Sequence, residues 1–257
     1  MMASGRRVLP SEGDDETMRY LDYTKLDSLD SEAFRGTNPF PLANPEGALT
    51  HEGFARLMGS LPSTKLFTSE FGVARSHGQS PHDRMSLEYS DDLSIDRSWH
   101  DFVSELRAPR YQAFLRRMFG RRMLALTFHW HYALDGCSVS PHCDARRKVG
   151  SHLFYFNTSD DWDESWGGQT VALDDGGRFP YKSAPAFDDF DRCVDSKTLD
   201  NRSFLFARTD SSWHGVREIH CPEGAYRRVF IVVVEDKKRS MLHSVIDRFE
   251  GKERARY

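Results

Sequence analysis

The chain has 257 residues and a formal net charge of −4, with basic and acidic residues mixed along its length. This length fits one domain with a sizeable core, and the mixed charge gives no clear nucleic-acid-binding signal. No run approaches the roughly 18 apolar residues of a membrane-spanning helix, and the start lacks the apolar core of a signal peptide. Four cysteines without C-x-x-C spacing indicate reduced thiols, so we expect a cytoplasmic protein.

The N-terminal region is expected to pack poorly. Residues 1–37 are polar and acidic with few apolar anchors, which predicts a disordered first dozen residues followed by a loosely packed arm. Residues 38–257 are expected to form a single domain. A Pro-rich loop at 38–47 leads into a helix that begins after Thr50, whose hydroxyl can cap it, and ends near Gly59.

Strands are predicted near 65–71 and 85–89, on either side of a polar segment that holds Arg75, His77, Gln79, His82 and Arg84. A solvated loop is the interpretation we favour, because loops collect polar residues whether or not they bind anything. A lid that faces a substrate is the alternative.

Two helices follow. Apolar residues recur at helical spacing from Trp99 to Leu106 and again over 111–118; Pro109 suits the first turn of the second helix, and Gly120 ends it. Helices of this kind commonly buttress one sheet of a β-rich domain.

From Met123 onward the pattern changes to short strands separated by turns. We predict strands near 123–133, 138–144, 151–157, 169–173, 202–208, 213–219 and 227–235. Short strands with Gly-containing turns indicate an antiparallel sandwich or barrel. The predicted fold is therefore mainly β with flanking helices (α+β), a double-stranded β-helix or jelly roll whose metal-binding core spans about 122–236. An acidic insertion occupies 174–201, and residues 240–249 predict a final amphipathic helix.

A candidate metal site lies in the sequence H-C-D at 142–144. Side chains alternate along a strand, so His142 and Asp144 should share one face while Cys143 points away. With 11 His and 39 acidic residues, chance alone supplies about two such H-x-[D/E] matches, so the context matters. Downstream, His214 lies between two apolar runs. Two His and one carboxylate leave adjacent positions of Fe(II) open for a chelating cosubstrate and O2.

These residues resemble the Fe(II)/2-oxoglutarate-dependent dioxygenase superfamily, and within it the prolyl-hydroxylase-like branch. The resemblance covers about 128–236 and rests on Tyr132, the H-C-D, Y-F-N at 155–157 followed by Trp162, W-G-G-Q-T-V-A-L around Gly167 and Gly168, His214 and Arg227. It implies that the catalytic centre binds Fe(II) through His142, Asp144 and His214. It also implies that Arg227 pairs with the distal carboxylate of 2-oxoglutarate, and that Tyr155 and Tyr132 line the cosubstrate pocket.

Arg227 and Arg228 stand together at the head of the apolar run V-F-I-V-V-V. A cation at the head of a buried strand needs an anion, and a ligand carboxylate suits a guanidinium group. A protein carboxylate or exposure at the strand end is the alternative. We choose Arg227, which would share an inward face with Val229, Ile231 and Val233.

We expect most of the other histidines, and the charges that follow the H-C-D, to have structural roles. We expect five histidines to be hydrogen-bonded packing residues: His129, His131, His152, His220 and His243. We expect a solvated charge run on the rim, formed by Arg146, Arg147 and Lys148. Its position could favour an acidic or phosphorylated substrate.

The resemblance implies an oxygenase that hydroxylates an amino-acid or protein side chain, with proline as the leading guess, and releases succinate and CO2. It also allows for ascorbate as a reductant. The expected partner is a small-molecule, peptide or protein substrate; the sequence does not indicate an oligomeric state. The alternative is a cupin-like protein that binds a ligand without turnover, or with Zn or Ni in place of iron.

Overall fold

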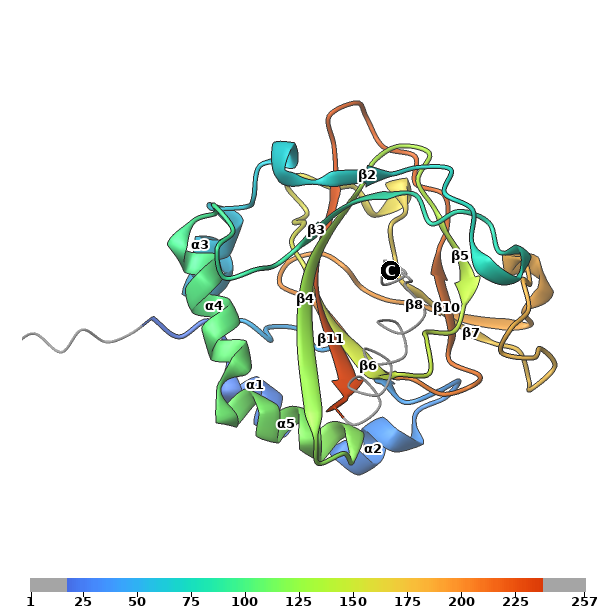
Figure 1. Ribbon diagram of the computed structural model, residues 1–257, viewed down its shortest axis with the longest axis horizontal. Coiled ribbons are helices and arrows are strands. Elements are labelled where there is room, and N and C mark those ends of the chain that lie inside the picture. Colours follow the sequence, from blue (N-terminus) through green and yellow to red (C-terminus); the bar gives the residue numbers. More distant parts are fainter. Residues whose placement is uncertain (1–17, 238–257) are drawn as a thin grey trace, which may run out of the picture.

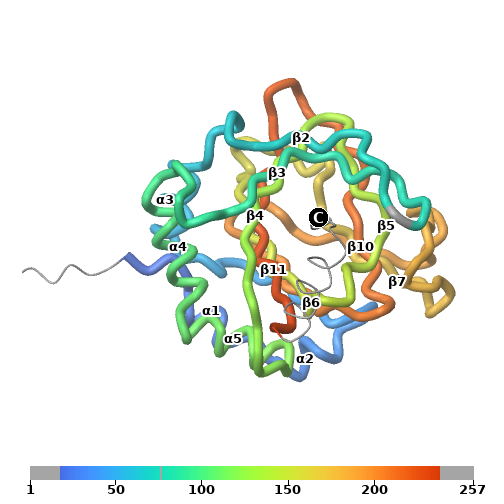
Figure 2. Tube along the Cα trace, in the orientation of Figure 1, coloured from blue at the N-terminus to red at the C-terminus, as the bar shows by residue number. Residues whose placement is uncertain are grey.

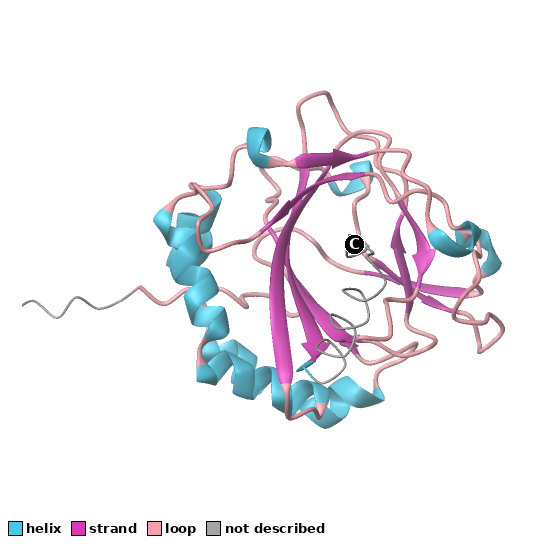
Figure 3. Ribbon diagram, in the orientation of Figure 1, coloured by secondary structure: helices cyan, strands magenta, loops and turns pink. Residues whose placement is uncertain are grey.

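The computed structural model describes residues 18–237, which form two antiparallel sheets that face each other, with helices on the outer face of the larger sheet (Figures 1 and 3). The helices are α1 (Tyr23–Ser28), α2 (Ser31–Gly36), α3 (His51–Met58), α4 (Arg97–Arg107) and α5 (Pro109–Phe119). The larger sheet has the order β1-β9-β6-β11-β4-β3-β2, and the smaller has the order β5-β10-β7-β8. This is the predicted jelly-roll architecture.

The strands follow the predicted positions closely, and Figure 2 traces them in sequence order. They are β1 (Leu42–Ala43), β2 (Thr68–Glu70), β3 (Arg84–Glu88), β4 (Leu124–Ala133), β5 (Val139–His142), β6 (Lys148–Tyr155), β7 (Val171–Asp174), β8 (Arg192–Asp195), β9 (Ser203–Ala207), β10 (Trp213–Val216) and β11 (Arg227–Asp236). Two of them, β1 and β8, were not predicted. All four residues of β8 are exposed, so this strand lacks the apolar alternation that marks a half-buried strand.

Strand β11 organises the larger sheet, because it pairs with β4 on one side and β6 on the other. Ile231 lies opposite His129 in β4 and Leu153 in β6, and these residues face the smaller sheet. Phe230 lies opposite Trp130 and Phe154, on the other face. One face of the sheet is therefore available for a site, while the other is covered.

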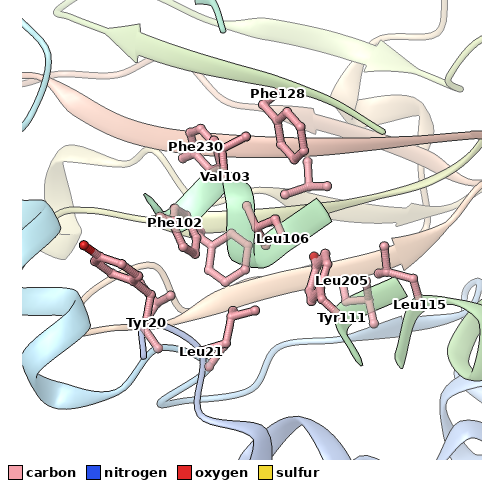
Figure 4. Close-up of a cluster of buried hydrophobic side chains, with 14 of the residues drawn as sticks. Tyr20, Leu21, Phe102, Val103, Leu106, Tyr111, Leu115, Phe128, Leu205 and Phe230 are labelled. Carbon is pink, nitrogen blue, oxygen red and sulfur yellow. The ribbon is translucent and has the colours of Figure 1, made fainter. Parts of the chain in front are cut away.

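Helices α4 and α5 cover the outer face, as the helical periodicity predicted (Figure 4). The Trp99 ring of α4 lies 5.1 Å from that of Trp130 and 5.3 Å from that of Phe230. Pro109 opens α5, and Gly120 closes it with a left-handed backbone at φ 63°. Fully burying each such aromatic side chain contributes about 1.5–3 kcal/mol to stability, so this layer stabilises the sheet behind the site.

The segment 18–37 differs from the expected loosely packed arm. It forms α1 and α2, and it buries Tyr20, Leu21, Tyr23, Leu26 and Phe34 in the main core. The Tyr20 backbone amide donates to the Glu105 carboxylate of α4 at 2.7 Å. The expectation was wrong for these residues because their aromatic side chains and two of their leucines face inward, although Met18 is exposed. Residues 1–17 and the predicted helix at 240–249 lie outside the described residues.

Candidate active site

Two histidines from neighbouring strands of the smaller sheet form the centre of the site. His142 of β5 and His214 of β10 lie directly opposite each other, and their ring centroids are 4.4 Å apart. One ligand atom each from His142, Asp144 and His214 lies within 4.8 Å of the other two. The structure thus brings together the three residues that the sequence predicted as a metal triad.

Hydrogen bonds orient both imidazoles. The Nδ1 atoms of His142 and His214 lie 3.0 Å from the Ser140 carbonyl and 2.9 Å from the Ser212 carbonyl. Because a carbonyl oxygen only accepts, each Nδ1 carries the proton, and each Nε2 keeps its lone pair. Burial lowers the pKa of both histidines, which keeps them neutral. Neutral imidazoles of fixed tautomer are what a metal ligand requires.

Asp144 lies beyond the end of β5, which stops at His142. Its Oδ1 accepts from the Lys148 ammonium at 2.7 Å, and both side chains are about nine-tenths buried. Burial would raise the pKa of Asp144, but the charge and the hydrogen bond of Lys148 act in the opposite direction, and the pKa is lowered. The carboxylate is therefore ionised and able to serve as a ligand.

Cys143 does not belong to this group. Its side chain packs with Val171, Leu173 and Trp213, and its thiol points to the Asp210 carbonyl at 3.7 Å. Burial raises the pKa of the Cys143 thiol to about 12, so it stays protonated. Two neutral imidazoles and one carboxylate, without a thiolate, form a donor set that fits Fe(II).

A cavity of about 310 Å³ opens beside the triad, within the size range of small-molecule sites. The larger sheet contributes His129, His131, Ile231 and Arg227 to its wall. His129 and His131, which the sequence suggested were packing residues, therefore face the cavity. Burial lowers the pKa of both, so they are neutral polar groups in its wall.

Arg227 is buried at one side of this cavity. Its Nε donates to the Gly168 carbonyl, and its Nη2 donates to Thr170 Oγ1 at 3.1 Å. Gly168 has a φ of 89°, and a Cβ there would lie 3.0 Å from Arg227 Cδ, so the close contact requires a glycine. No carboxylate within the described part of the chain forms an ion pair with Arg227.

The two predicted tyrosines lie in different places. The Tyr155 ring centroid is 5.6 Å from the Arg227 guanidinium carbon, and its hydroxyl donates to Thr170 Oγ1 at 2.8 Å, so it supports the arginine from behind the cavity wall. Tyr132 faces the opposite side of β4, where its ring centroid lies 4.3 Å from that of Phe67. The prediction that Tyr132 lines the pocket was wrong: the cavity-facing neighbour is His131.

Comparison with known proteins agrees with this geometry. Residues 127–233 match the family described as the 2OG-Fe(II) oxygenase superfamily. This region is a 2OG-Fe(II) oxygenase domain. The protein is therefore an enzyme that uses Fe(II) and 2-oxoglutarate, as the resemblance implied, and the family match favours this over a cupin-like binding protein. A comparison with curated protein sequences found no match.

Several solved structures have a fold similar to that of this chain. The chain is similar to a prolyl hydroxylase from Trichoplax adhaerens in complex with a peptide fragment of the hypoxia inducible factor (15% identity, 82% of this chain and 91% of that chain, TM-score 0.59). It is also similar to a prolyl-4-hydroxylase from Pseudomonas putida (11%, 76% and 92%, TM-score 0.54) and to the carbocyclase SnoK from nogalamycin biosynthesis (10%, 82% and 86%, TM-score 0.56). At these identities the likeness shows the fold.

Several cavity residues of the oxygenase were not predicted. Lys148 was expected in a solvated charge run but is buried against Asp144, and Arg147 pairs with Glu235 at 2.9 Å; only Arg146 is largely exposed. The polar segment 75–84, for which a solvated loop was favoured, contributes side chains to the cavity. The i, i+4 spacing of Asp144 and Lys148 was the available signal for their ion pair. No helix among residues 18–237 is long and apolar enough to cross a membrane.

Proposed function

We propose that this oxygenase hydroxylates an amino-acid or protein side chain, with proline as the leading guess. In this proposal His142, Asp144 and His214 hold the iron, and Arg227 binds the distal carboxylate of 2-oxoglutarate. The observation that carries it is the meeting of the triad and the buried Arg227 at one cavity. The structures of prolyl hydroxylases with the same fold support the choice of substrate class.

Arg227 and Thr170 are suited to receive a carboxylate together. Thr170 Oγ1 accepts from Tyr155 Oη and from Arg227 Nη2, which leaves its own hydroxyl proton for another acceptor. Thr170 lines the cavity beside Arg227. A ligand carboxylate in this position would accept from both residues and would neutralise the buried guanidinium group.

Iron and 2-oxoglutarate supply the oxidising chemistry when they are bound, with release of succinate and CO2. The contribution of the chain is positional. The Ser140 and Ser212 carbonyls fix the imidazole tautomers, and the aromatic layer behind β4 and β11 packs against the back of the cavity wall. Ile231 and Val233 add apolar surface to the cavity, which limits water near the reacting groups.

The experiment that tests the proposal measures succinate formed from 2-oxoglutarate by purified protein with Fe(II) in air. It is repeated over a panel of free amino acids, proline-containing peptides and proteins. We expect Asp144→Ala to lose both bound iron and succinate formation while its circular dichroism spectrum stays native. Full succinate formation by Asp144→Ala would overturn the assignment of the triad.

A further inference from the structure

Five lysine and arginine side chains line the cavity: Arg75, Arg84, Arg147, Lys148 and Arg227. Three of them form ion pairs, namely Arg84 with Glu70 at 2.6 Å, Arg147 with Glu235 at 2.9 Å and Lys148 with Asp144 at 2.7 Å. Arg75 and Arg227 form no ion pair with any residue in the range 18–237. In the proposed function Arg227 binds a carboxylate of the cosubstrate. Of the five cations, Arg75 is then the one that still lacks a counter-ion within the described part of the chain.

The neighbours of Arg75 do not neutralise it. Its Nε is buried and has no hydrogen-bond partner among residues 18–237. Burial and the nearby Arg84 lower its pKa, against the opposing effect of Asp144 and Glu70. Both of those carboxylates are already engaged, with Lys148 and Arg84 respectively. A half-buried cation of this kind favours an external counter-ion.

The segment that carries Arg75 is attached to the opposite sheet. The Asp83 amide donates to the Ser138 carbonyl at 3.1 Å, and His82 bridges to Val139 of β5. Further along, Gln79 donates to the Ser183 carbonyl at 3.1 Å. Segment 71–83 therefore connects the edge of the larger sheet to the strand that carries His142. These contacts hold Arg75 at the cavity.

Arg75 lies in the part of the cavity wall that is next to the metal triad. The His82 ring centroid is 4.4 Å from that of His142, and both rings line the cavity with Arg75. Arg75 therefore shares this cavity with all three residues of the triad. His82 donates through Nε2 to Ser140 Oγ, because that hydroxyl gives its own proton to the Ser80 carbonyl. His82 is held in place by this bond, and the guanidinium group of Arg75 supplies a positive charge beside it.

We propose that Arg75 binds an anionic group of the substrate, a carboxylate in the first instance, beside the triad. This inference rests on the proposed function and narrows its substrate class. The substrate is then a small molecule with a free carboxylate, such as a free amino acid, whose α-carboxylate meets Arg75. A residue inside a peptide chain has an uncharged backbone amide in that place and lacks this contact.

The test is a binding experiment with matched probes. Protein loaded with Zn(II) and saturated with 2-oxoglutarate is titrated by calorimetry with free amino acids, proline included, and with the corresponding amino-acid amides. Inorganic phosphate and O-phosphoserine are added to separate carboxylate from phosphate recognition. We expect at least one free amino acid in the panel to bind about tenfold or more tightly than its amide, which lacks the carboxylate charge. Arg75→Gln should abolish this preference, and Arg75→Lys should keep part of it.

Arg97→Gln is the matched control, because this arginine is 83% exposed and pairs with Asp101 on the outer helix α4. It should keep the preference for anions. Equal affinity for anions and their amides in the wild type, or a preference that survives Arg75→Gln, would overturn the inference. Absence of succinate formation with Fe(II) would instead count against the proposed function, and the anion preference can then be measured without 2-oxoglutarate.

Discussion

Arg227 and Arg228 are adjacent in β11, yet their guanidinium groups lie on opposite faces of the strand. Arg227 reaches the cavity and bonds to Gly168 and Thr170, whereas Arg228 pairs with Asp161. This arrangement agrees with the strand alternation from which Arg227 was chosen, and it makes the two residues a matched pair for experiment.

Arg227→Ala should raise the Michaelis constant for 2-oxoglutarate by about thirtyfold or more, because loss of a buried charge-assisted contact costs on the order of 2–5 kcal/mol. Arg228→Ala should change it much less. Both variants are measured by titration of 2-oxoglutarate in turnover without added substrate. A large effect confined to Arg228→Ala would show that the cosubstrate lies on the other face.

Thr170→Val should raise the same Michaelis constant by about tenfold. The change removes a hydroxyl that has a proton to give to a ligand carboxylate, and a hydrogen bond to a charged group contributes about 1.5–3 kcal/mol. Thr170→Ser keeps the hydroxyl and serves as the control. If Thr170→Val bound 2-oxoglutarate normally, the cosubstrate carboxylate would not lie beside Thr170.

His131→Ala should weaken 2-oxoglutarate binding and Tyr132→Phe should not, because the two side chains lie on opposite faces of β4. His131 lines the cavity, so its loss should weaken 2-oxoglutarate binding several-fold. The Tyr132 hydroxyl is buried on the helix-covered face and has no hydrogen-bond partner within the described part of the chain. Its removal should leave binding unchanged and should keep or raise the free energy of unfolding, by up to about 1 kcal/mol. Calorimetric titration and urea unfolding of both variants measure these effects. Weaker 2-oxoglutarate binding by Tyr132→Phe would contradict the placement of Tyr132 on the face of β4 away from the cavity.

Lys148→Met should destabilise the metal-free protein and strengthen its metal binding. Removal of one partner of a buried ion pair typically costs 3–5 kcal/mol, because the other charge is left uncompensated. A divalent cation at Asp144 supplies the missing charge, so the rise in melting temperature on addition of Zn(II) should be larger than in the wild type. Scanning calorimetry with chelator and with Zn(II) measures both effects. Weaker Zn(II) binding would mean that Lys148 orients Asp144 for the metal.

His152 should make the fold less stable in acid. It is fully buried and bonds to Tyr111 Oη at 2.9 Å, and burial lowers its pKa to about 3 from 6.5. Between these values the unfolded chain binds the extra proton, so stability falls as the pH falls through 6.5. The contribution of His152 is about 2 kcal/mol between pH 7 and pH 5. The free energy of unfolding is measured by urea at both pH values. In the double variant Tyr111→Phe/His152→Leu, its decrease from pH 7 to pH 5 should be about 2 kcal/mol smaller than in the wild type. An unchanged pH dependence would exclude His152 as its source.

The sequence by itself determined the elements and several of the faces. Helical spacing marked α4 and α5, the Thr50 hydroxyl caps α3 as predicted, and alternation placed Arg227 with Val229, Ile231 and Val233. These features depend on neighbours within a few residues, so local periodicity is sufficient to predict them. The H-x-D motif belongs to the same class, since two of the three clustered donors lie two residues apart.

The tertiary structure alone decided which distant residues meet. The pairing of β5 with β10 sets His142 against His214, 72 residues later, and the pairing of β3 with β4 decides that His131 rather than Tyr132 faces the cavity. A shift of one residue exchanges the two faces of a strand, and its pattern alone could not exclude that shift here, because His131 and Tyr132 are both suited to a pocket. Arg75 and Lys148 read as solvated charges in the sequence because burial of a cation depends on the elements that close over it, which no local pattern records.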